Sequence, residues 1–313
     1  MSKSKEVLKV LSYCKKGSKQ LQIGWISEKR KNGILPLKLS IDESKMRGDG
    51  FNRKGGIIDL IDNPSEMRSI KNQIKLFKKT KNDADLIPLS KVNQIPMIPR
   101  RNLICVGKNY TDHVKEIAKV NIGLTSDVPK FPIFFTKVPD TVIGPKKGVE
   151  AHSDITNWLD YEAELAVIIG KKGKNIKPEN ALKHVFGYTV ANDITSRDIQ
   201  KKHVQWFKGK TLDTTCPMSA TVLLHKKGFD PNNLNIKLWL NGECKQSSNT
   251  SKMIFNIATI ISELSQGFTL NPGDIILTGT PDGVGYPQQI ALKSGDIMKI
   301  EIETVGSLTN YVK

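Results

Sequence analysis

The stretch Asp160–Gly170, with the sequence DYEAELAVIIG, constrains the fold of this chain more than any other part of it. Its second half, LAVII, is an apolar and largely β-branched run of the kind that fills a buried strand. Side chains alternate between the two faces of a strand, so Asp160, Glu162 and Glu164 would all point to one side. The fold therefore has to accommodate three neighbouring carboxylates at the start of a strand that is buried further along.

Three carboxylates on one strand face admit two interpretations. Like charges at this spacing repel one another, and burying a carboxylate without a partner costs free energy. A divalent cation removes both difficulties, because hard ions such as Mg²⁺ are held by carboxylate oxygens. Alternatively, the acids lie at a solvated end of the strand, which needs no cation. The stretch alone leaves both interpretations open.

Length and composition limit the class of protein. A chain of 313 residues can form one large domain, or a large and a small one, with an ample hydrophobic core. No segment approaches the ~20 apolar residues that span a bilayer, and Met1–Gln20 does not resemble a signal peptide. The four cysteines are scattered and form no CxxC pair, so neither a zinc site nor a disulfide framework is indicated. We therefore predict a cytoplasmic protein that has no membrane partner.

The net charge of +17 is concentrated in the first third of the chain. Residues 1–100 hold 22 Lys and Arg against 10 Asp and Glu, whereas residues 101–313 hold 26 against 21. Such a bias can mark a nucleic-acid-binding surface, but little aromatic interleaving and no helix-turn-helix, zinc-finger or RNA-binding motif accompanies it. A solvated basic surface that attracts small anions is the favoured interpretation. A non-catalytic protein that binds nucleic acid through residues 1–98 is the remote alternative, and no nucleic-acid partner is expected.

The pattern of short elements divides the chain near residue 98, at the proline-spaced connector Ile95–Pro99. Before it, two apolar runs with a turn between them predict a small β-meander, and Ser65–Lys79 has apolar residues at helical spacing. After it, the apolar runs become longer and the basic excess falls. We predict a small, basic, β-rich N-terminal domain over residues 1–98 and a larger domain over residues 99–313.

A short helix predicted after the strand Leu103–Val106 carries His113 and Glu116 on one face, because the two are three residues apart. A carboxylate placed in this way can orient an imidazole and stabilise its charged form, as a water-activating general base requires. The same HxxE spacing is also common on surface helices. The pair is therefore either a candidate catalytic dyad or part of a solvated helix face.

Three further features follow along the chain. Asp193 comes directly after the predicted strand Val185–Asn192, where it can complete a metal site on a neighbouring strand or cap the helix that follows. Lys210 follows a glycine and is either a surface lysine or a cation that stabilises an enolate near a metal. The loop Thr278–Gly285, TGTPDGVG, lacks the G-K-[ST] of a phosphate loop. It is better interpreted as a tight loop whose backbone and Thr280 approach a small ligand.

Six segments occur in a fixed order: GKNYTDHVKE, FFTK, DYEAELAVIIG, GYTVANDITSRDIQ, KGKTLDTTCP and LNPGDIILTGTPDGVG. Together they resemble the fumarylacetoacetate hydrolase family over residues 100 to about 305. The resemblance implies an α+β, predominantly β fold: the mixed β-sheet roll of that family with short helices, beside the small β-rich N-terminal domain. It also implies that residues 99–313 form the catalytic domain and that the protein is a homodimer.

The resemblance assigns roles to nine residues. It implies a carboxylate site for Mg²⁺ or Mn²⁺, a dyad that activates water, a lysine that faces the negative charge developing on the substrate, and side chains that line the same pocket. The implied residues are Glu162, Glu164 and Asp193 for the metal, His113, Glu116 and Lys210 for catalysis, and Arg197, Gln200 and Thr280 for substrate binding. Asp160 points the same way as the two glutamates but matches no metal ligand of the family.

One departure from the family pattern bears on the substrate. Some members add a fourth carboxylate to the metal from the segment before the HxxE helix, and this chain has Asn109 there. The difference favours the branch of the family that acts on small 2-oxo acids such as acylpyruvates and oxaloacetate. We therefore predict a metal-dependent hydrolase that cleaves a C–C bond through a metal-stabilised enolate. The same enolate supports isomerisation or tautomerisation, decarboxylation or a lyase reaction, which together form the alternative prediction.

Overall fold

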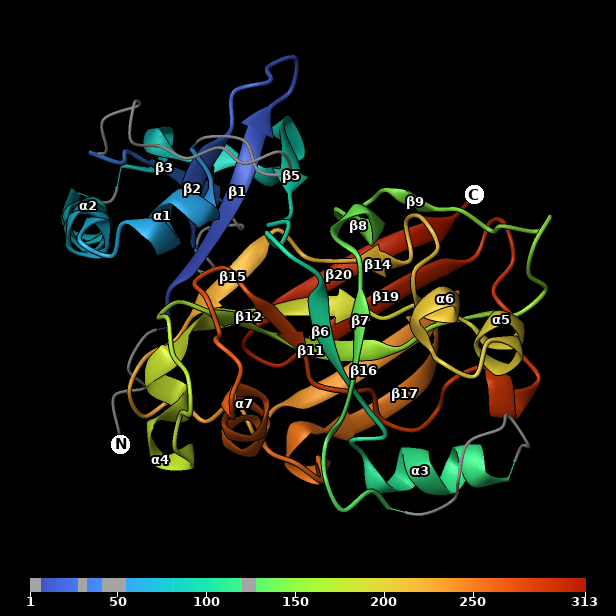
Figure 1. The fold of residues 1–313 in the computed structure, drawn as a ribbon. Coiled ribbons are helices and arrows are strands. Elements are labelled where there is room, and N and C mark those ends of the chain that lie inside the picture. Colours follow the sequence, from blue (N-terminus) through green and yellow to red (C-terminus); the bar gives the residue numbers. More distant parts are fainter. Residues whose placement is uncertain (1–6, 28–32, 41–54, 81, 120–127) are drawn as a thin grey trace, which may run out of the picture.

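The computed structural model describes residues 7–27, 33–40, 55–80, 82–119 and 128–313. Within these ranges the chain forms one large sheet and one smaller sheet, with short helices around them (Figure 1). The predicted class, mixed α+β and mainly β, is confirmed. No helix in the described ranges is long and apolar enough to cross a membrane.

The large sheet has eleven strands. In spatial order they are β4 (Ile87–Pro88), β3 (Gly33–Leu37), β2 (Gln22–Ser27), β1 (Lys9–Lys15), β15 (Thr221–Leu224), β12 (Val185–Asn192), β11 (Ala163–Ile169), β18 (Ile275–Leu277), β6 (Leu103–Gly107) and β7 (Ile133–Lys137), with β5 (Val92–Ile95) paired to β1. All of these pairs are antiparallel except β18 with β6. The predicted strand Val185–Asn192 matches β12 residue for residue.

The N-terminal strands continue the same sheet as the later ones. Strand β1 pairs with β15 in the register Lys9↔Leu223, so the meander formed by β1, β2 and β3 extends the sheet rather than standing apart from it. Helices α1 (Ile57–Asp62) and α2 (Glu66–Thr80) lie beside these strands in Figure 1. The domain boundary near residue 98 stays a prediction.

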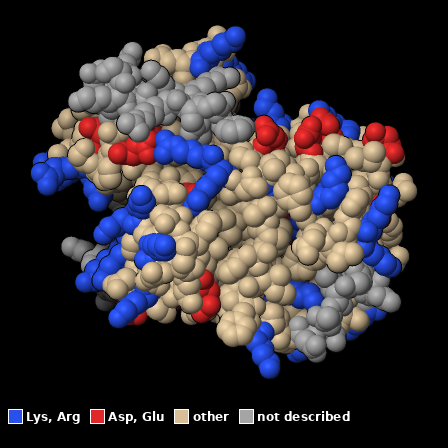
Figure 2. All heavy atoms as spheres, in the orientation of Figure 1, with Lys and Arg blue, Asp and Glu red and all other residues tan. Residues whose placement is uncertain are grey.

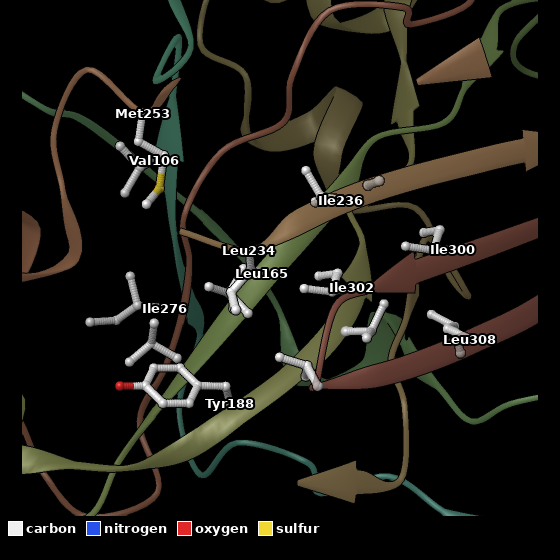
Figure 3. Close-up of a cluster of buried hydrophobic side chains, with 14 of the residues drawn as sticks. Val106, Leu165, Tyr188, Leu234, Ile236, Met253, Ile276, Ile300, Ile302 and Leu308 are labelled. Atoms are coloured by element: carbon white, nitrogen blue, oxygen red, sulfur yellow. The ribbon is translucent and has the colours of Figure 1, made fainter. Parts of the chain in front are cut away.

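The smaller sheet packs on the large one. Its strands, in order, are β17 (Glu243–Asn249), β16 (Asn235–Leu240), β19 (Ile297–Ile302), β20 (Gly306–Val312) and β9 (Gly148–Val149). Buried and exposed residues alternate along β19, so Ile300 and Ile302 point inward. Figure 3 shows them facing Leu165 of β11 and Tyr188 of β12, in a cluster that joins the two sheets. Burying such side chains contributes ~1.5–3 kcal/mol each, which makes this cluster a main source of stability.

Strand β11 is buried on both faces. Leu165, Val167 and Ile169 belong to the cluster between the sheets, whereas Ala166 and Ile168 belong to a second cluster on the opposite face. A strand covered on both sides needs apolar residues at every position, which explains the uninterrupted LAVII run.

The acidic start of the predicted strand differs from expectation. The residues before β11 leave the ladder, and Leu159–Asp160 forms a separate two-residue strand, β10, that pairs with β13 (Thr195–Ser196). The stretch Asp160–Gly170 is therefore not one continuous strand. Its acids are held by loop and helix segments as well as by the sheet.

The helices are short, as predicted, but their lengths differ in detail. Apolar spacing predicts a helix over Ile254–Phe268, whereas the structure has the nine-residue α7 (Ile257–Ser265). The helix begins after Asn256, because the Asn256 side chain caps it by accepting the Thr259 N–H. The longest described helix is α2, with fifteen residues. The remaining elements are α3 (Thr111–Ala118), α4 (Pro178–Ala181), α5 (Arg197–Lys202), α6 (Phe207–Lys210), the strands β8 (Val142–Ile143) and β14 (Cys216–Pro217), and six 3₁₀ turns at Asp83–Asp85, Leu89–Lys91, Pro139–Thr141, Leu182–His184, Thr250–Lys252 and Tyr286–Gln288.

On the face drawn in Figure 2, charged side chains are distributed rather than gathered in one stripe. Figure 2 shows Lys and Arg at several separate places on one face of the molecule, with Asp and Glu among them and an uncharged area at the centre. This distribution on the visible face is that of a solvated basic surface.

Candidate metal centre

Three carboxylates meet at one end of the paired strands β11 and β12. Glu162, Glu164 and Asp193 each offer an oxygen, and the three oxygens lie within 4.8 Å of one another. The antiparallel register Ala163↔Asn192 explains the meeting, because it brings the start of β11 beside the end of β12. The three side chains are buried, with at most 4% of each residue exposed. Within the described ranges, no other group of acids, histidines or cysteines could hold a metal in this way.

Lys210, the last residue of α6, bridges two of these acids. Its Nζ lies 2.7 Å from Glu162 Oε2 and 2.7 Å from Asp193 Oδ2. The glycine before it is required by packing, since a Cβ on Gly209 would lie 2.6 Å from the backbone nitrogen of Gln200. The structure thus brings the predicted lysine to the predicted metal ligands and buries it there.

A second lysine, Lys137 at the end of β7, was not identified from the sequence as a site residue. Its Nζ lies 2.9 Å from Asp193 Oδ1 and donates to the carbonyl oxygen of Ile194 at 3.0 Å. Lys137 has no exposed surface. Its segment, FFTK, carries the resemblance to the family but gives no sign in the sequence that its lysine turns inward.

Arg197 connects the triad to Asp160. Its Nε lies 2.9 Å from Asp160 Oδ2, and its Nη2 lies 2.7 Å from Glu162 Oε1. The Asp160 carboxylate also accepts the backbone N–H groups of Gly285 at 2.6 Å and Tyr286 at 3.1 Å. Asp160 therefore orients the arginine and a loop. Gln200, one turn after Arg197 on α5, accepts a hydrogen bond from Arg197 Nη1 at 3.3 Å.

The predicted dyad lies on helix α3, and His113 lines the same cavity as Glu162 and Glu164. His113 Nδ1 and Glu116 Oε2 are 3.5 Å apart on α3, and His113 is buried. The Glu116 carboxylate also accepts the N–H of Gly283, at 3.0 Å from each oxygen. The carboxylate is thereby fixed from two sides and can orient the imidazole.

The loop Thr278–Gly285 holds the acids with its backbone. Gly279 donates to Glu164 Oε2 at 2.7 Å, and it needs to be glycine because its φ is +97° and a Cβ would lie 2.7 Å from that of Asn109. The Thr280 hydroxyl lies 2.9 Å from Gln246 Nε2, and Gln246 also accepts the N–H of Ala163 between the two glutamates. Gln246 was not identified from the sequence, and its strand, β17, gives no local signal of this contact.

The Asn109 side chain is hydrogen-bonded to backbone groups of two other segments. Its Nδ2 donates to the carbonyl oxygens of Phe255 and Thr278, and its Oδ1 accepts the N–H of Phe255. The amide therefore joins two segments of backbone.

Buried charges of both signs meet at the site. Four buried carboxylates, Asp160, Glu162, Glu164 and Asp193, lie among four buried cations, Lys108, Lys137, Arg197 and Lys210. Lys137, Arg197 and Lys210 form ion pairs with Asp160, Glu162 and Asp193, whereas Glu164 accepts the backbone N–H of Gly279. Glu164 is one of the three acids that offer oxygens to a common point.

The two glutamates differ in their proton affinity. Burial and the neighbouring charges of Asp193 and Glu162 raise the pKa of Glu164 well above its usual range. Burial also opposes ionisation of Glu162, but Lys210 and Arg197 outweigh it and hold the pKa of Glu162 at about 2. A divalent cation would offset the repulsion among the three acids, and three carboxylate oxygens are the donor set that Mg²⁺ and Mn²⁺ prefer. The residues present therefore fit such an ion.

A narrow cavity of about 30 Å³ opens onto the acids. Its lining includes seven of the predicted site residues and several others that the sequence did not single out: His113, Glu162, Glu164, Arg197, Gln200, Lys210 and Thr280, with Val106, Lys108, Ile117, Phe135 and Trp206. A wider groove of about 590 Å³ lies between β1 and the β19–β20 hairpin. The smaller cavity is the better candidate, because the buried charges converge on it whereas the groove is bordered by exposed residues such as Lys237 and Glu301.

Comparison with known proteins agrees with these features. Residues 102–313 match the family model described as fumarylacetoacetate (FAA) hydrolase, C-terminal. Among curated proteins, oxaloacetate tautomerase YisK of Bacillus subtilis (strain 168) is 44% identical over 266 residues, which cover 82% of this chain and 86% of that protein.

Two solved structures extend the comparison. Fumarylacetoacetate hydrolase (EaFAH) from psychrophilic Exiguobacterium antarcticum is 35% identical with a TM-score of 0.75, and the match covers 98% of this chain and 99% of the other. Fumarylpyruvate hydrolase from Pseudomonas aeruginosa, in complex with Mn²⁺ and pyruvate, is 33% identical with a TM-score of 0.61, covering 70% of this chain and 91% of the other. The first of these matches includes the N-terminal strands.

Proposed function

The chain belongs to the fumarylacetoacetate hydrolase family, and within it we propose that this enzyme is a divalent-metal-dependent oxaloacetate tautomerase. The observation that carries the proposal is the buried triad of carboxylates with a lysine bridging two of them. The motifs predict C–C bond hydrolysis first and tautomerisation as the alternative. The 44% identity to a protein named oxaloacetate tautomerase favours the alternative.

The proposed cofactor is Mg²⁺ or Mn²⁺, held by Glu162, Glu164 and Asp193. When bound, the ion would act as a Lewis acid that stabilises negative charge on the oxygens of a 2-oxo acid. The convergence of three buried carboxylate oxygens, and the Mn²⁺ in the complex of the Pseudomonas aeruginosa relative, support this assignment.

The side chains around the cavity suit an anionic substrate whose enolate has to be stabilised. Interconversion of keto and enol oxaloacetate moves one proton between C3 and the oxygen on C2, and negative charge develops on that oxygen between the two forms. The Lys210 ammonium is placed to stabilise this charge. His113, oriented by Glu116, can take up and return the proton. Arg197, Gln200 and Thr280 would bind the carboxylates of the substrate.

The experiment is an assay of enol–keto exchange of oxaloacetate, followed by the ultraviolet absorbance of the enol. We expect the protein to accelerate the exchange, EDTA to abolish the acceleration, and added Mg²⁺ or Mn²⁺ to restore it. The Glu164→Ala variant should not respond to added metal. Exchange that is indifferent both to EDTA and to Glu164→Ala would contradict the metal assignment.

Hydrolysis of acylpyruvates is the second candidate function, and the His113–Glu116 dyad favours it. Hydrolysis needs an activated water, so His113→Ala should abolish it, whereas enol–keto exchange should survive in part because solvent can exchange the same proton. A wild-type protein that cleaves acylpyruvates and leaves the tautomers of oxaloacetate unchanged would show that hydrolysis is the main reaction.

We also propose that the enzyme works as a homodimer in the cytoplasm, as the family resemblance and the sequence indicate. Light scattering after size exclusion tests the first point, because a homodimer has twice the chain mass of 34.9 kDa. Cell fractionation tests the second.

A further inference from the structure

Lys137 is a buried cation for which neither the family resemblance nor the proposed reaction provides a role. It is the last residue of β7, none of its surface is exposed, and it does not line the narrow cavity. Its Nζ lies 2.9 Å from Asp193 Oδ1 and 3.0 Å from the carbonyl oxygen of Ile194. Removing an ammonium from water is costly, and here the compensation comes from one carboxylate oxygen and one backbone carbonyl.

The two lysines at Asp193 differ in what else they can reach. Lys210 contacts Asp193 Oδ2, is shared with Glu162 and lines the cavity. Lys137 contacts Asp193 Oδ1, the opposite oxygen, and forms no ion pair with the glutamates. Each oxygen of Asp193 thus has its own lysine, and only one of the two lysines can also approach a molecule in the cavity.

We propose that Lys137 is a positioning residue that fixes the Asp193 carboxylate and remains its counter-ion throughout the reaction. This role rests on the proposed function. With Lys137 in place, Lys210 can turn from Asp193 toward a bound 2-oxo acid without leaving a buried carboxylate unpaired. A carboxylate held at one oxygen also presents the other in a fixed direction, which is how groups behind a metal ligand strengthen metal binding.

The test compares Mn²⁺ binding by four proteins: the wild type, Lys137→Met, Lys137→Gln and Lys137→Arg. Free Mn²⁺ is measured by electron paramagnetic resonance, so the readout does not depend on turnover. We expect Lys137→Met and Lys137→Gln to bind Mn²⁺ about 10–100-fold more weakly than the wild type, the range found when a group behind a metal ligand is removed. The Lys137→Arg variant should lie between, because it keeps the charge. The matched control is Lys172→Met, which removes an exposed lysine and should bind as the wild type does.

A melting experiment separates positioning from a general effect on stability. Mn²⁺ raises the melting temperature by binding the folded state, and the rise shrinks as affinity falls. We expect a smaller Mn²⁺-induced rise in Lys137→Gln than in the wild type. If Mn²⁺ raises the melting temperature of both proteins equally, and Lys137→Gln only melts at a lower temperature than the wild type in EDTA, the role of Lys137 is purely structural and the proposal is overturned. Lys137→Gln keeps a donor for the Ile194 carbonyl, so it decides the question if Lys137→Met does not fold.

Kinetic measurements complete the test, and they distinguish a failure of the Lys137 proposal from a failure of the proposed function. We expect kcat for oxaloacetate tautomerisation in saturating Mn²⁺ to fall at least tenfold in Lys137→Gln, with a smaller change in KM, because Lys210 is then retained at Asp193. Unchanged Mn²⁺ affinity and kcat in this variant would overturn the role of Lys137 alone. A wild type that binds Mn²⁺ but does not accelerate tautomerisation would instead overturn the proposed function.

Discussion

The two ends of strand β11 are equally buried and are held by different forces. At the carboxyl-terminal end, Leu165, Val167 and Ile169 are at most 1% exposed and pack in the cluster between the sheets (Figure 3). At the amino-terminal end, Glu162 and Glu164 are at most 4% exposed and are surrounded by ionised and hydrogen-bonding groups. The apolar end gains free energy from burial itself, whereas the acidic end loses it unless partners are supplied.

The difference shows which end of the strand serves stability and which serves function. The partners of the acidic end come from the separate elements α5 and α6 and from the loop after β18. Even so, burial and the charges of Asp193 and Glu162 raise the pKa of Glu164. A buried ion pair stabilises a fold no more than well-packed apolar residues of the same volume, and often less. We therefore infer that the acidic end is maintained for binding a cation and that the apolar end is what holds β11 in place.

The largest effect is expected for Lys210→Met, which should lower the reaction rate by changing the acidic end of β11. Methionine is similar in length but cannot stabilise negative charge, so we expect the rate of oxaloacetate tautomerisation at saturating metal to fall about 10²–10³-fold, as when one oxyanion-stabilising donor is lost. Steady-state kinetics in Mg²⁺ give the measurement. Activity within threefold of the wild type would show that Lys210 serves only to neutralise the acids.

Leu165→Ala should give the converse result at the apolar end. Truncating a fully buried leucine leaves a cavity, and we expect the free energy of unfolding to fall by about 2–5 kcal/mol. Urea unfolding followed by circular dichroism measures this. The rate per folded molecule should stay close to that of the wild type, although Leu165 is the residue next to Glu164. A rate loss comparable to that of Lys210→Met would mean that the two ends are not separable.

The sequence predicted the apolar end of β11 more completely than the acidic end. Hydrophobic runs identify β11 and β12 because burial on both faces leaves a local record in the chain. The break after Asp160 depends on the pairing of β10 with β13, which no local pattern reveals. The turn Ser294–Asp296 also predicts one closing strand that ends at Val305–Gly306. The structure instead has two strands there, β19 and β20, so β20 was missed.

The site residues follow the same division. The three acids, the dyad and Lys210 were found because they lie in motifs whose order resembles a known family. Lys137 and Gln246 were missed, because their contacts are made across the tertiary structure and neither residue type is unusual at its position. A lysine in a chain with 48 Lys and Arg residues gives no sign of being buried until the fold is known. Roles that depend on such contacts cannot be inferred from one sequence.

The pH dependence of stability should distinguish the two ends in the absence of metal. The pKa of Glu164 is raised in the folded protein, so folding takes up a proton between the unfolded value, about 4.3, and the folded value. Over that window, raising the pH disfavours the folded state. We expect Glu164→Gln in EDTA to gain stability relative to the wild type as the pH rises from 4 toward neutrality. Unfolding at several pH values measures the difference, and a gain that shrinks with rising pH would contradict the assigned shift.

The smallest effect is expected for an ion pair that is exposed to solvent and lies away from the acidic end of β11. The pair Lys299–Glu301 on β19 has an N–O distance of 2.7 Å, the same as Lys210 to Glu162, but its side chains are 49% and 47% exposed. Solvent screens such a pair, so Glu301→Gln should change the free energy of unfolding by about 0–1 kcal/mol, less still in high salt, and leave activity unchanged. Urea unfolding at low and high salt gives the measurement. A loss of several kcal/mol would mean that distance, and not burial, decides what an ion pair does in this fold, and the contrast between the acidic site and the surface would fail.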